Sequence, residues 1–409
     1  MRIPFSKPDV GEQEIQAVTN CLRSGRLSLG PLLEEFETKF ANYIGSRHAI
    51  ATSSGTAALH LCVEALGIGP RHDVITTAFT FVASTNCLLY ENAHPVFADI
   101  DPRSLNLDPQ QIRQVIHRNY EQDTITNRWI HRHSGRTLKA LLPVHVFGLP
   151  CDIDPVLEIA HELRLHVIED ACEALGAEYH HKRVGTFGDV GVFAFYPNKQ
   201  ITTAEGGMIV TNNPELAALC RSVRSQGRAA DGGWLIHDRL GFNYRLSELH
   251  CALGIAQMER LDEFLERRNH AAEIYSRALA DVPEIALPPD SLDVKRSWFA
   301  YVIQLLGVAA DWRDQLIAFL YARGIDCRPY FPAIHEQPYF RALQLHLAGP
   351  LPHTESASKS CIALPFFPSI TQNEIHEVVF AIREFLAQQH TQQRIRAEYP
   401  AQANAQVAQ

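Results

Sequence analysis

The chain has 409 residues, of which 46% are hydrophobic and 20% are charged, and its formal net charge is -9. This composition is that of an ordinary globular protein, and the length predicts two domains of unequal size. The acidic balance argues against a surface that binds nucleic acid or anionic membranes. No apolar stretch reaches the length of a membrane span.

Cysteine and histidine usage limits the possible chemistry further. The nine cysteines form no Cys-x-x-Cys pair and their number is odd, which favours buried thiols over a disulfide framework or a zinc site. The 20 histidines include no His-Glu-x-x-His motif, so we expect no metal. The chain opens without a signal-peptide pattern. These features together predict a cytoplasmic protein.

Short β-rich segments alternate with helical patterns through the first 210 residues. We expect helices at 8–24, 32–44, 56–66, 81–90, 109–117, 152–163 and 214–225. We expect strands at 74–77, 95–98, 141–145, 165–169, 190–195 and 208–210. Continuous apolar strands separated by helices predict an α/β fold with a mostly parallel sheet covered on both faces. The polar segment 111–137 favours a solvated excursion over a binding patch.

A second, smaller α/β unit is expected after the sheet. Apolar spacing at 246–265 predicts a long helix that leaves the sheet, followed by a helix at 269–280 and a proline-rich link at 282–289. Further elements are a strand at 299–305 and helices at 312–323 and 372–388. We therefore expect a large domain over 1–255 and a small domain over 256–388. Residues 389–409, rich in Gln and Ala, are expected to form a disordered tail.

Lys199 is the most informative residue, because it follows a short apolar strand and aromatic residues and precedes the pair Gly206-Gly207. Partial burial of an amine favours its neutral form, which attacks carbonyl carbons. A lysine on a surface loop is the simpler alternative. The residues expected near Lys199 decide between the two.

Three further features lie at places where ligands bind in such sheets, near the carboxyl ends of strands. The small residues around Gly55 and Thr56 precede a helix and could hold a phosphate, although an ordinary helix cap is possible. Asp170 ends a strand and could keep a pyridine nitrogen protonated, or serve as a cap or an ion-pair partner. Phe81 could stack on a ring or belong to the core.

The order and wording of these motifs resemble the nucleotide-sugar aminotransferases, the DegT–StrS group of fold-type I pyridoxal-phosphate enzymes. The likeness extends from about Ile3 to Leu386. The shared motifs are Ser54-Gly-Thr-Ala-Ala-Leu59, Thr80-Phe81, Pro143-Val-His-Val-Phe-Gly148, Glu169-Asp170, Asn198-Lys199, Thr202-Thr203, Glu205-Gly-Gly207, Gly241-Phe-Asn-Tyr-Arg245, Arg328-Pro-Tyr-Phe-Pro-Ala-Ile-His335 and Leu364-Pro365.

The resemblance implies a fold-type I aminotransferase with pyridoxal 5′-phosphate as cofactor. By the same resemblance, Lys199 would hold the cofactor covalently and move the proton during transfer. Asp170 would pair with the pyridine nitrogen, Phe81 would stack on the ring, and Gly55 with Thr56 would hold the phosphate.

Other implied roles concern the partner subunit and the substrate. Asn243 would reach the phosphate from the neighbouring subunit, which implies a homodimer with shared active sites. Arg328 and His335 would line the entrance for the nucleotide sugar.

Two residues depart from the family pattern. Ala194 stands where the family usually has a serine that donates to the phosphate, and one neutral hydrogen bond contributes about 0.5–1.5 kcal/mol. Glu173 stands where many members have a glutamine that donates to the phenolic oxygen of the cofactor. A carboxylate would repel that oxygen, so we expect Glu173 to be protonated or turned towards the substrate. Its Asp-Ala-x-Glu-Ala setting also resembles members that aminate C4 of a sugar.

The implied reaction transfers the amino group of glutamate to a keto sugar, at C4, of a nucleotide-activated deoxyhexose, in polysaccharide biosynthesis. Within the same fold the alternatives are a sugar dehydratase, in which histidine replaces the lysine, and a non-catalytic or regulatory protein that binds the cofactor or a nucleotide sugar. A Rossmann-type dehydrogenase would need Gly-x-Gly-x-x-Gly after its first strand, and the glycines at 185–191 lack that spacing.

Overall fold

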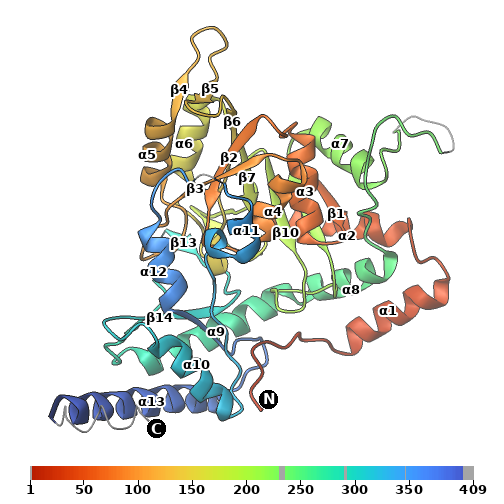
Figure 1. Cartoon of the computed structure of the whole chain (residues 1–409). Coiled ribbons are helices and arrows are strands. Elements are labelled where there is room, and N and C mark those ends of the chain that lie inside the picture. Colours follow the sequence, from red (N-terminus) through yellow and green to blue (C-terminus); the bar gives the residue numbers. More distant parts are fainter. Residues whose placement is uncertain (1, 230–234, 290–292, 346, 399–409) are drawn as a thin grey trace.

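The computed structural model describes residues 2–229, 235–289, 293–345 and 347–398 (Figure 1). Within these residues the main sheet has the strand order β1-β11-β10-β7-β6-β2-β3, with the hairpin β4-β5 attached to β6. The strands of the main path are β1 (His48–Thr52), β2 (His72–Thr77), β3 (His94–Ala98), β6 (Thr137–Leu142), β7 (His166–Asp170), β10 (Val190–Ala194) and β11 (Gly207–Thr211).

Most neighbours on the main path of this sheet run parallel, but β11 is antiparallel to both β1 and β10, and the attached hairpin is antiparallel as well. The predicted mostly parallel α/β sheet is confirmed. The sequence prediction did not include β1, which is an edge strand paired only with β11. It also could not give the direction of β11, since a buried apolar strand has the same pattern in either direction.

Helices cover both faces of the sheet, and adjacent strand residues belong to different cores. Val74 packs in one hydrophobic cluster and Ile75 in the other, because successive side chains of a strand point to opposite faces. One face is covered by α2 (Pro31–Ile44), α5 (Pro109–Asn119), α6 (Ile153–Leu163) and α8 (Glu248–Glu259), and the other by α3 (Gly55–Ala65), α4 (Ala83–Tyr90) and α7 (Pro214–Arg224).

Local signals place several helix starts where the sequence predicts them. Asp108 and Asn213 accept hydrogen bonds from backbone N–H groups in the first turns of α5 and α7, and a proline follows each cap. A side-chain acceptor followed by proline at the first helical position is a strong start signal. The first helix, α1 (Glu12–Ser24), begins four residues later than the prediction.

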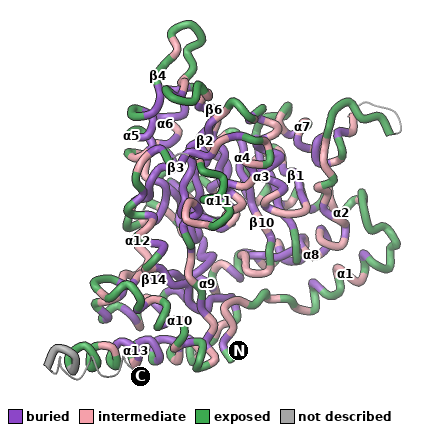
Figure 2. Tube along the Cα trace, in the orientation of Figure 1, coloured by how far each residue is buried: buried purple, intermediate pink, exposed green. Residues whose placement is uncertain are grey.

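The polar segment 111–137 is only partly the solvated excursion that the sequence predicts. Strands β4 (Tyr120–Gln122) and β5 (Trp129–His131) form a hairpin that joins the sheet through the pair Ile130 and Thr137. Its turn is exposed, as Figure 2 shows at the tip beyond β4. Tyr120, however, is buried and its hydroxyl donates to Asp73 Oδ2 at 2.8 Å. The hairpin is therefore anchored by a buried contact.

The predicted helix at 246–265 is divided at Arg260, where α8 ends and α9 (Leu261–Leu279) begins. The expected domain boundary after residue 255 thus falls within α8. Helix α9 packs against a separate hydrophobic cluster beneath the antiparallel sheet of β12 (Ile285–Ala286), β14 (Tyr301–Leu305) and β15 (Cys361–Leu364).

The remaining elements are those of the C-terminal part of the chain, a small strand group and one short helix, η1, between β6 and α6. They are α10 (Trp312–Ala322), η2 (Ile334–Glu336), α11 (Pro338–Ala342), α12 (Pro352–Ser360), α13 (Gln372–Glu398), η1 (Val146–Gly148), and the strands β8 (Glu178–Tyr179), β9 (Lys182–Arg183) and β13 (Val294–Lys295). Helix α13 runs ten residues beyond the predicted end at 388, into the expected tail. Residues 399–409 of that tail lie outside the described residues.

Candidate active site

A cavity of about 420 Å³ lies at the carboxyl ends of β7 and β10, facing Phe299 and the Tyr330-Phe331 segment. Six of the residues singled out in the sequence line it together: Gly55, Thr56, Phe81, Asp170, Glu173 and Lys199. The first and the last of them in the sequence are more than a hundred residues apart. The cavity is therefore the place where the predicted chemistry converges.

Lys199 is held in a turn just after β10. Its backbone N–H donates to the carbonyl of Tyr196 at 2.9 Å. Its Nζ lies 3.6 Å from Glu173 Oε1 and 4.0 Å from the centre of the Phe299 ring, and its side chain is only 13% exposed. A partly buried amine beside a carboxylate and an aromatic face is well placed both to exchange protons and to attack a carbonyl.

Arg268 of α9 fixes the backbone of this turn, and the sequence analysis missed it. Its Nη2 donates to the Lys199 carbonyl at 2.9 Å, and its Nη1 donates to the Phe299 carbonyl at 3.2 Å. The guanidinium is buried, and burial lowers its pKa to about 9. The sequence did contain a signal for Arg268, because this residue interrupts the apolar face that Phe264 and Ala271 form on the same helix. A cation on such a face must bind buried acceptors.

Asp170, the last residue of β7, is buried and receives two hydrogen bonds. Ser84 Oγ donates to its Oδ2 at 2.7 Å, and the backbone N–H of Cys172 donates to its Oδ1 at 3.1 Å. Donors of this kind stabilise the ionised form of a carboxylate. Ser84 was also missed by the sequence analysis, which treated its segment only as a helix.

The start of α3 forms a cradle for an anion. Ser54 caps the helix by accepting from the Ala57 N–H at 3.1 Å, and the first N–H groups of a helix, here those of Gly55 and Thr56, have no partner within the helix. A Cβ on Gly55 would lie 2.7 Å from Ala194 Cβ, so only glycine fits at this point. Such a helix start, with its partial positive charge, suits a phosphate group.

Glu173 is buried and lines the same cavity. Its Oε2 accepts a hydrogen bond from the backbone N–H of Phe147 at 2.9 Å. Phe147 has a left-handed φ of 54°, which residues other than glycine rarely adopt. Burial raises the pKa of Glu173, an effect that Lys199 and the Phe147 N–H partly offset. The direction of this shift favours the protonated form, one of the two outcomes expected from the sequence.

Three predicted site residues do not line the cavity. Asn243 is exposed and its backbone pairs with Ser225. Arg328 forms an ion pair with Asp326, with Nη2 and Oδ2 3.0 Å apart. The His335 side chain is buried, and its ring centre lies 6.5 Å from that of Phe97. Their expected roles in binding remain predictions.

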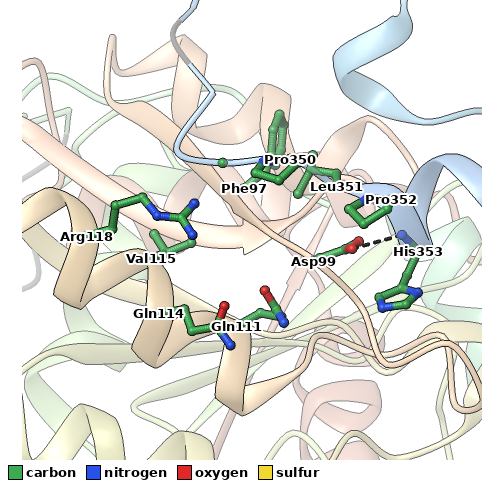
Figure 3. Close-up of a pocket in the computed structure, with 11 residues that line it drawn as sticks. Phe97, Asp99, Gln111, Gln114, Val115, Arg118, Pro350, Leu351, Pro352 and His353 are labelled. Atoms are coloured by element: carbon green, nitrogen blue, oxygen red, sulfur yellow. Dashed lines mark hydrogen bonds between the residues drawn. The ribbon is translucent and has the colours of Figure 1, made fainter.

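A second, smaller cavity of about 120 Å³ lies between α5 and the start of α12 (Figure 3). Its buried carboxylate, Asp99, accepts from the backbone N–H groups of His353 and Thr354, both at 2.9 Å. These contacts cap α12, which gives Asp99 a structural role. In the described part of the chain, no cluster of three His, Cys, Asp or Glu side chains is arranged to hold a metal ion, and no helix has the length and apolar character of a membrane span.

Comparison with known proteins decides the family. Residues 8–383 match the DegT/DnrJ/EryC1/StrS aminotransferase family. The chain belongs to this family. It is 38% identical over 388 residues to a GDP-perosamine synthase of Caulobacter vibrioides, covering 94% of this chain and 98% of that protein. It is 34% identical over 398 residues to the spore coat polysaccharide biosynthesis protein SpsC of Bacillus subtilis, covering 94% of this chain and 97% of that protein.

A solved structure gives the same answer. The crystal structure of S. venezuelae DesV in complex with a ketimine intermediate superposes with a TM-score of 0.83 at 33% identity, covering 94% of this chain and 98% of that chain. DegT/DnrJ/EryC1/StrS enzymes have fold type I and depend on pyridoxal 5′-phosphate, and the protein is therefore a pyridoxal-phosphate-dependent aminotransferase. The recognised family, the fold class and the cofactor expected from the sequence are confirmed.

The cavity residues fit this cofactor. The start of α3 suits its phosphate, the buried Asp170 suits its pyridine nitrogen, and Lys199 would supply the amine. Phe81 is 58% exposed although it follows a buried strand, which leaves its apolar ring available to an aromatic ligand.

Proposed function

We propose that the protein transfers the amino group of glutamate to a keto sugar linked to a nucleotide, most simply at C4 of a deoxyhexose. The observation behind this proposal is the convergence of Lys199, Asp170 and the α3 start on one cavity, in a chain related over nearly its whole length to a protein named GDP-perosamine synthase. The same lysine argues against the sugar dehydratase alternative.

In this reaction the bound cofactor supplies an electron sink that stabilises negative charge on the carbon losing a proton. Lys199 Nζ would hold the cofactor in the resting enzyme and, once the incoming amine has taken its place, would move that proton, because its freed amine stays in the same cavity. Asp170 would hold the ring nitrogen in its protonated state. Phe299 and the Tyr330-Phe331 segment cover the lysine and help to exclude water.

Glu173 is the residue that supports the choice of C4, through its likeness in setting to members that aminate this carbon. Its raised pKa lets the carboxyl group be protonated and act as a donor towards the phenolic oxygen of the cofactor, in the place of the usual glutamine. The donor substrate, glutamate, is proposed by the same resemblance.

We further propose that the enzyme works as a cytoplasmic homodimer in which Asn243 completes the site of the partner subunit. Asn243 is exposed and lies outside its own cavity. The same projecting segment, seen beside α7 in Figure 1, exposes Leu235, Ile236 and Leu240, the last of them 86% exposed. Apolar side chains gathered in this way are typical of a protein interface. The nine cysteines, all within the described ranges, are free thiols, which supports a reducing compartment.

The test is a panel of keto nucleotide sugars with glutamate as donor, followed by mass spectrometry of the products. We expect a product in which an amine replaces the carbonyl oxygen, and NMR places the new amine on C4. Lys199→Ala should abolish turnover, and borohydride reduction should attach the cofactor to the peptide that contains Lys199. A fully active Lys199→Ala variant, or a panel without any aminated sugar, would contradict the proposal.

A further inference from the structure

We propose that Ser84 is a positioning residue for the cofactor, acting through Asp170. The two side chains come from different elements, α4 and β7, and are 86 residues apart in the sequence. Ser84 is 1% exposed and Asp170 is 4% exposed, so neither partner can replace the contact with bulk water. The hydrogen bond of 2.7 Å between them is shorter than the one that the carboxylate of Asp170 accepts from the Cys172 N–H, at 3.1 Å.

The direction of this hydrogen bond follows from the neighbouring groups. An ionised carboxylate can only accept, so the single proton of Ser84 Oγ points to Asp170 Oδ2. The alternative acceptor, the carbonyl of Phe81, is farther away at 3.3 Å. Thr80 Oγ1 lies 3.1 Å from Ser84 Oγ and can donate its own proton to it. The result is a buried chain of donors, Thr80 to Ser84 to Asp170.

These hydrogen bonds affect the protonation of the ring nitrogen that Asp170 would face when the cofactor is bound. A proton between a pyridine nitrogen and a carboxylate stays on the nitrogen only if the carboxylate is kept ionised. Ser84 on Oδ2 and the Cys172 N–H on Oδ1 both stabilise that charge, and together they fix the plane of the carboxylate. Ser84 therefore keeps the proton on the ring, where it strengthens electron withdrawal.

The neighbouring residue provides a matched control. Thr85 lies on the same turn of α4 and is 0% exposed, but its Oγ1 has no hydrogen-bond partner among the described residues. Replacing it with valine removes a buried hydroxyl without breaking a contact. A loss that comes only from disturbing α4 would be common to Thr85→Val and Ser84→Ala, whereas a loss through Asp170 would be confined to Ser84→Ala.

The experiment measures cofactor binding without any sugar. The apoproteins of the wild type, Ser84→Ala, Ser84→Thr and Thr85→Val are titrated with pyridoxal 5′-phosphate, and the visible absorbance of each bound form is followed against pH. For Ser84→Ala we expect roughly tenfold weaker binding, the size of one hydrogen bond to a charged group. The midpoint of the absorbance change of its bound form should move to higher pH, because a less positive ring withdraws less electron density from the nitrogen of Lys199.

Ser84→Thr should restore both values, Thr85→Val should match the wild type, and the melting temperatures of the apoproteins should differ little. An unchanged affinity and pH midpoint in Ser84→Ala would overturn the proposal, as would equal losses in Thr85→Val. Because no sugar or amino donor is present, failure here is distinguishable from failure of the proposed function.

Discussion

Ala194, the last residue of β10, packs against the anion cradle of α3. If Gly55 carried a Cβ, the nearest atom to it would be the Cβ of Ala194. Its methyl group cannot donate a hydrogen bond at a place where the family usually has serine. The cradle must therefore rely on backbone N–H groups and on the helix start. At the scale of a single residue, this is a site where affinity for the cofactor can be improved.

We predict that Ala194→Ser tightens binding of pyridoxal 5′-phosphate by about 0.5–1.5 kcal/mol, because it adds one hydrogen-bond donor near the phosphate. Equilibrium titration of the apoprotein measures the change. Cysteine has nearly the same shape as serine but is a poor hydrogen-bond donor. Ala194→Cys should therefore bind the cofactor as tightly as the wild type does. Equal affinities for the serine variant and the wild type would mean that position 194 does not reach the phosphate.

Glu173 makes the stability of the apoprotein depend on pH. Its pKa in the folded protein is raised above the ordinary 4.5, so the folded state holds a proton that the unfolded state releases. The free energy of unfolding therefore decreases as pH rises from 4.5 through the raised pKa. Glutamine cannot titrate, so the free energy of unfolding of Glu173→Gln should increase relative to that of the wild type as pH rises through this range. Below pH 4.5 the difference between the two proteins should be constant.

Thermal melting of the two apoproteins between pH 4 and pH 8 measures this effect. Glu205→Gln removes an exposed carboxylate that lines the same cavity, and it serves as the control for a change of charge alone. Parallel melting curves for the wild type and Glu173→Gln over the whole range would show that Glu173 does not take up a proton on folding.

At the scale of elements, α9 connects the lysine turn to the C-terminal part of the chain. Arg260, where α8 ends, forms ion pairs with Asp9 and Glu14 from the N-terminal segment. Eight residues later, Arg268 holds the carbonyls of Lys199 and Phe299. The two arginines join three distant segments along one helix, which makes the position of the lysine turn depend on α9.

We predict that Arg268→Met leaves these buried carbonyls without donors, which costs about 1–3 kcal/mol for an unpaired buried group. Lys199 would also lose its fixed backbone. The melting temperature of the apoprotein and the yield of borohydride-trapped cofactor on Lys199 should both fall. Arg268→Lys should restore them only in part, because an ammonium lacks the planar fork of a guanidinium.

Arg277 on the exposed face of the same helix is the matched control, and Arg277→Met should change neither value. If Arg268→Met gave the same yield of borohydride-trapped cofactor as the wild type, the turn would keep its shape without this arginine.

For the molecule as a dimer, the proposed sharing of active sites predicts complementation between two defective chains. Lys199→Ala lacks the catalytic amine, and Asn243→Ala would weaken the site of the partner. A mixed dimer would then contain one site with both defects and one with neither. Refolding the two variants together should recover roughly a quarter of wild-type activity at limiting cofactor, as expected for random pairing in a twofold dimer.

Each variant refolded alone is the control, and light scattering measures the mass of the mixed sample. Activity equal to the average of the separate variants would mean that Asn243 acts within its own chain, or that the chains do not share a site.

The α/β class, the family, the cofactor and six of the residues that line the cavity could be predicted from the sequence. These depend on local information: apolar periodicity, caps such as Asp108 and Asn213, and short motifs such as the one that contains Lys199. Such signals involve neighbours in the chain, so they can be recognised without knowing which segments meet.

The three-dimensional fold was needed to see the antiparallel direction of β11, the buried anchor of the β4-β5 hairpin, the division of the predicted helix at Arg260, and the partners of the site residues. Ser84 contacts Asp170 across 86 residues, and Arg268 contacts Lys199 across 69. The physical reason is the same in each case: these contacts are stabilised by burial and by hydrogen bonds between distant segments, and they exist only once those segments have folded together.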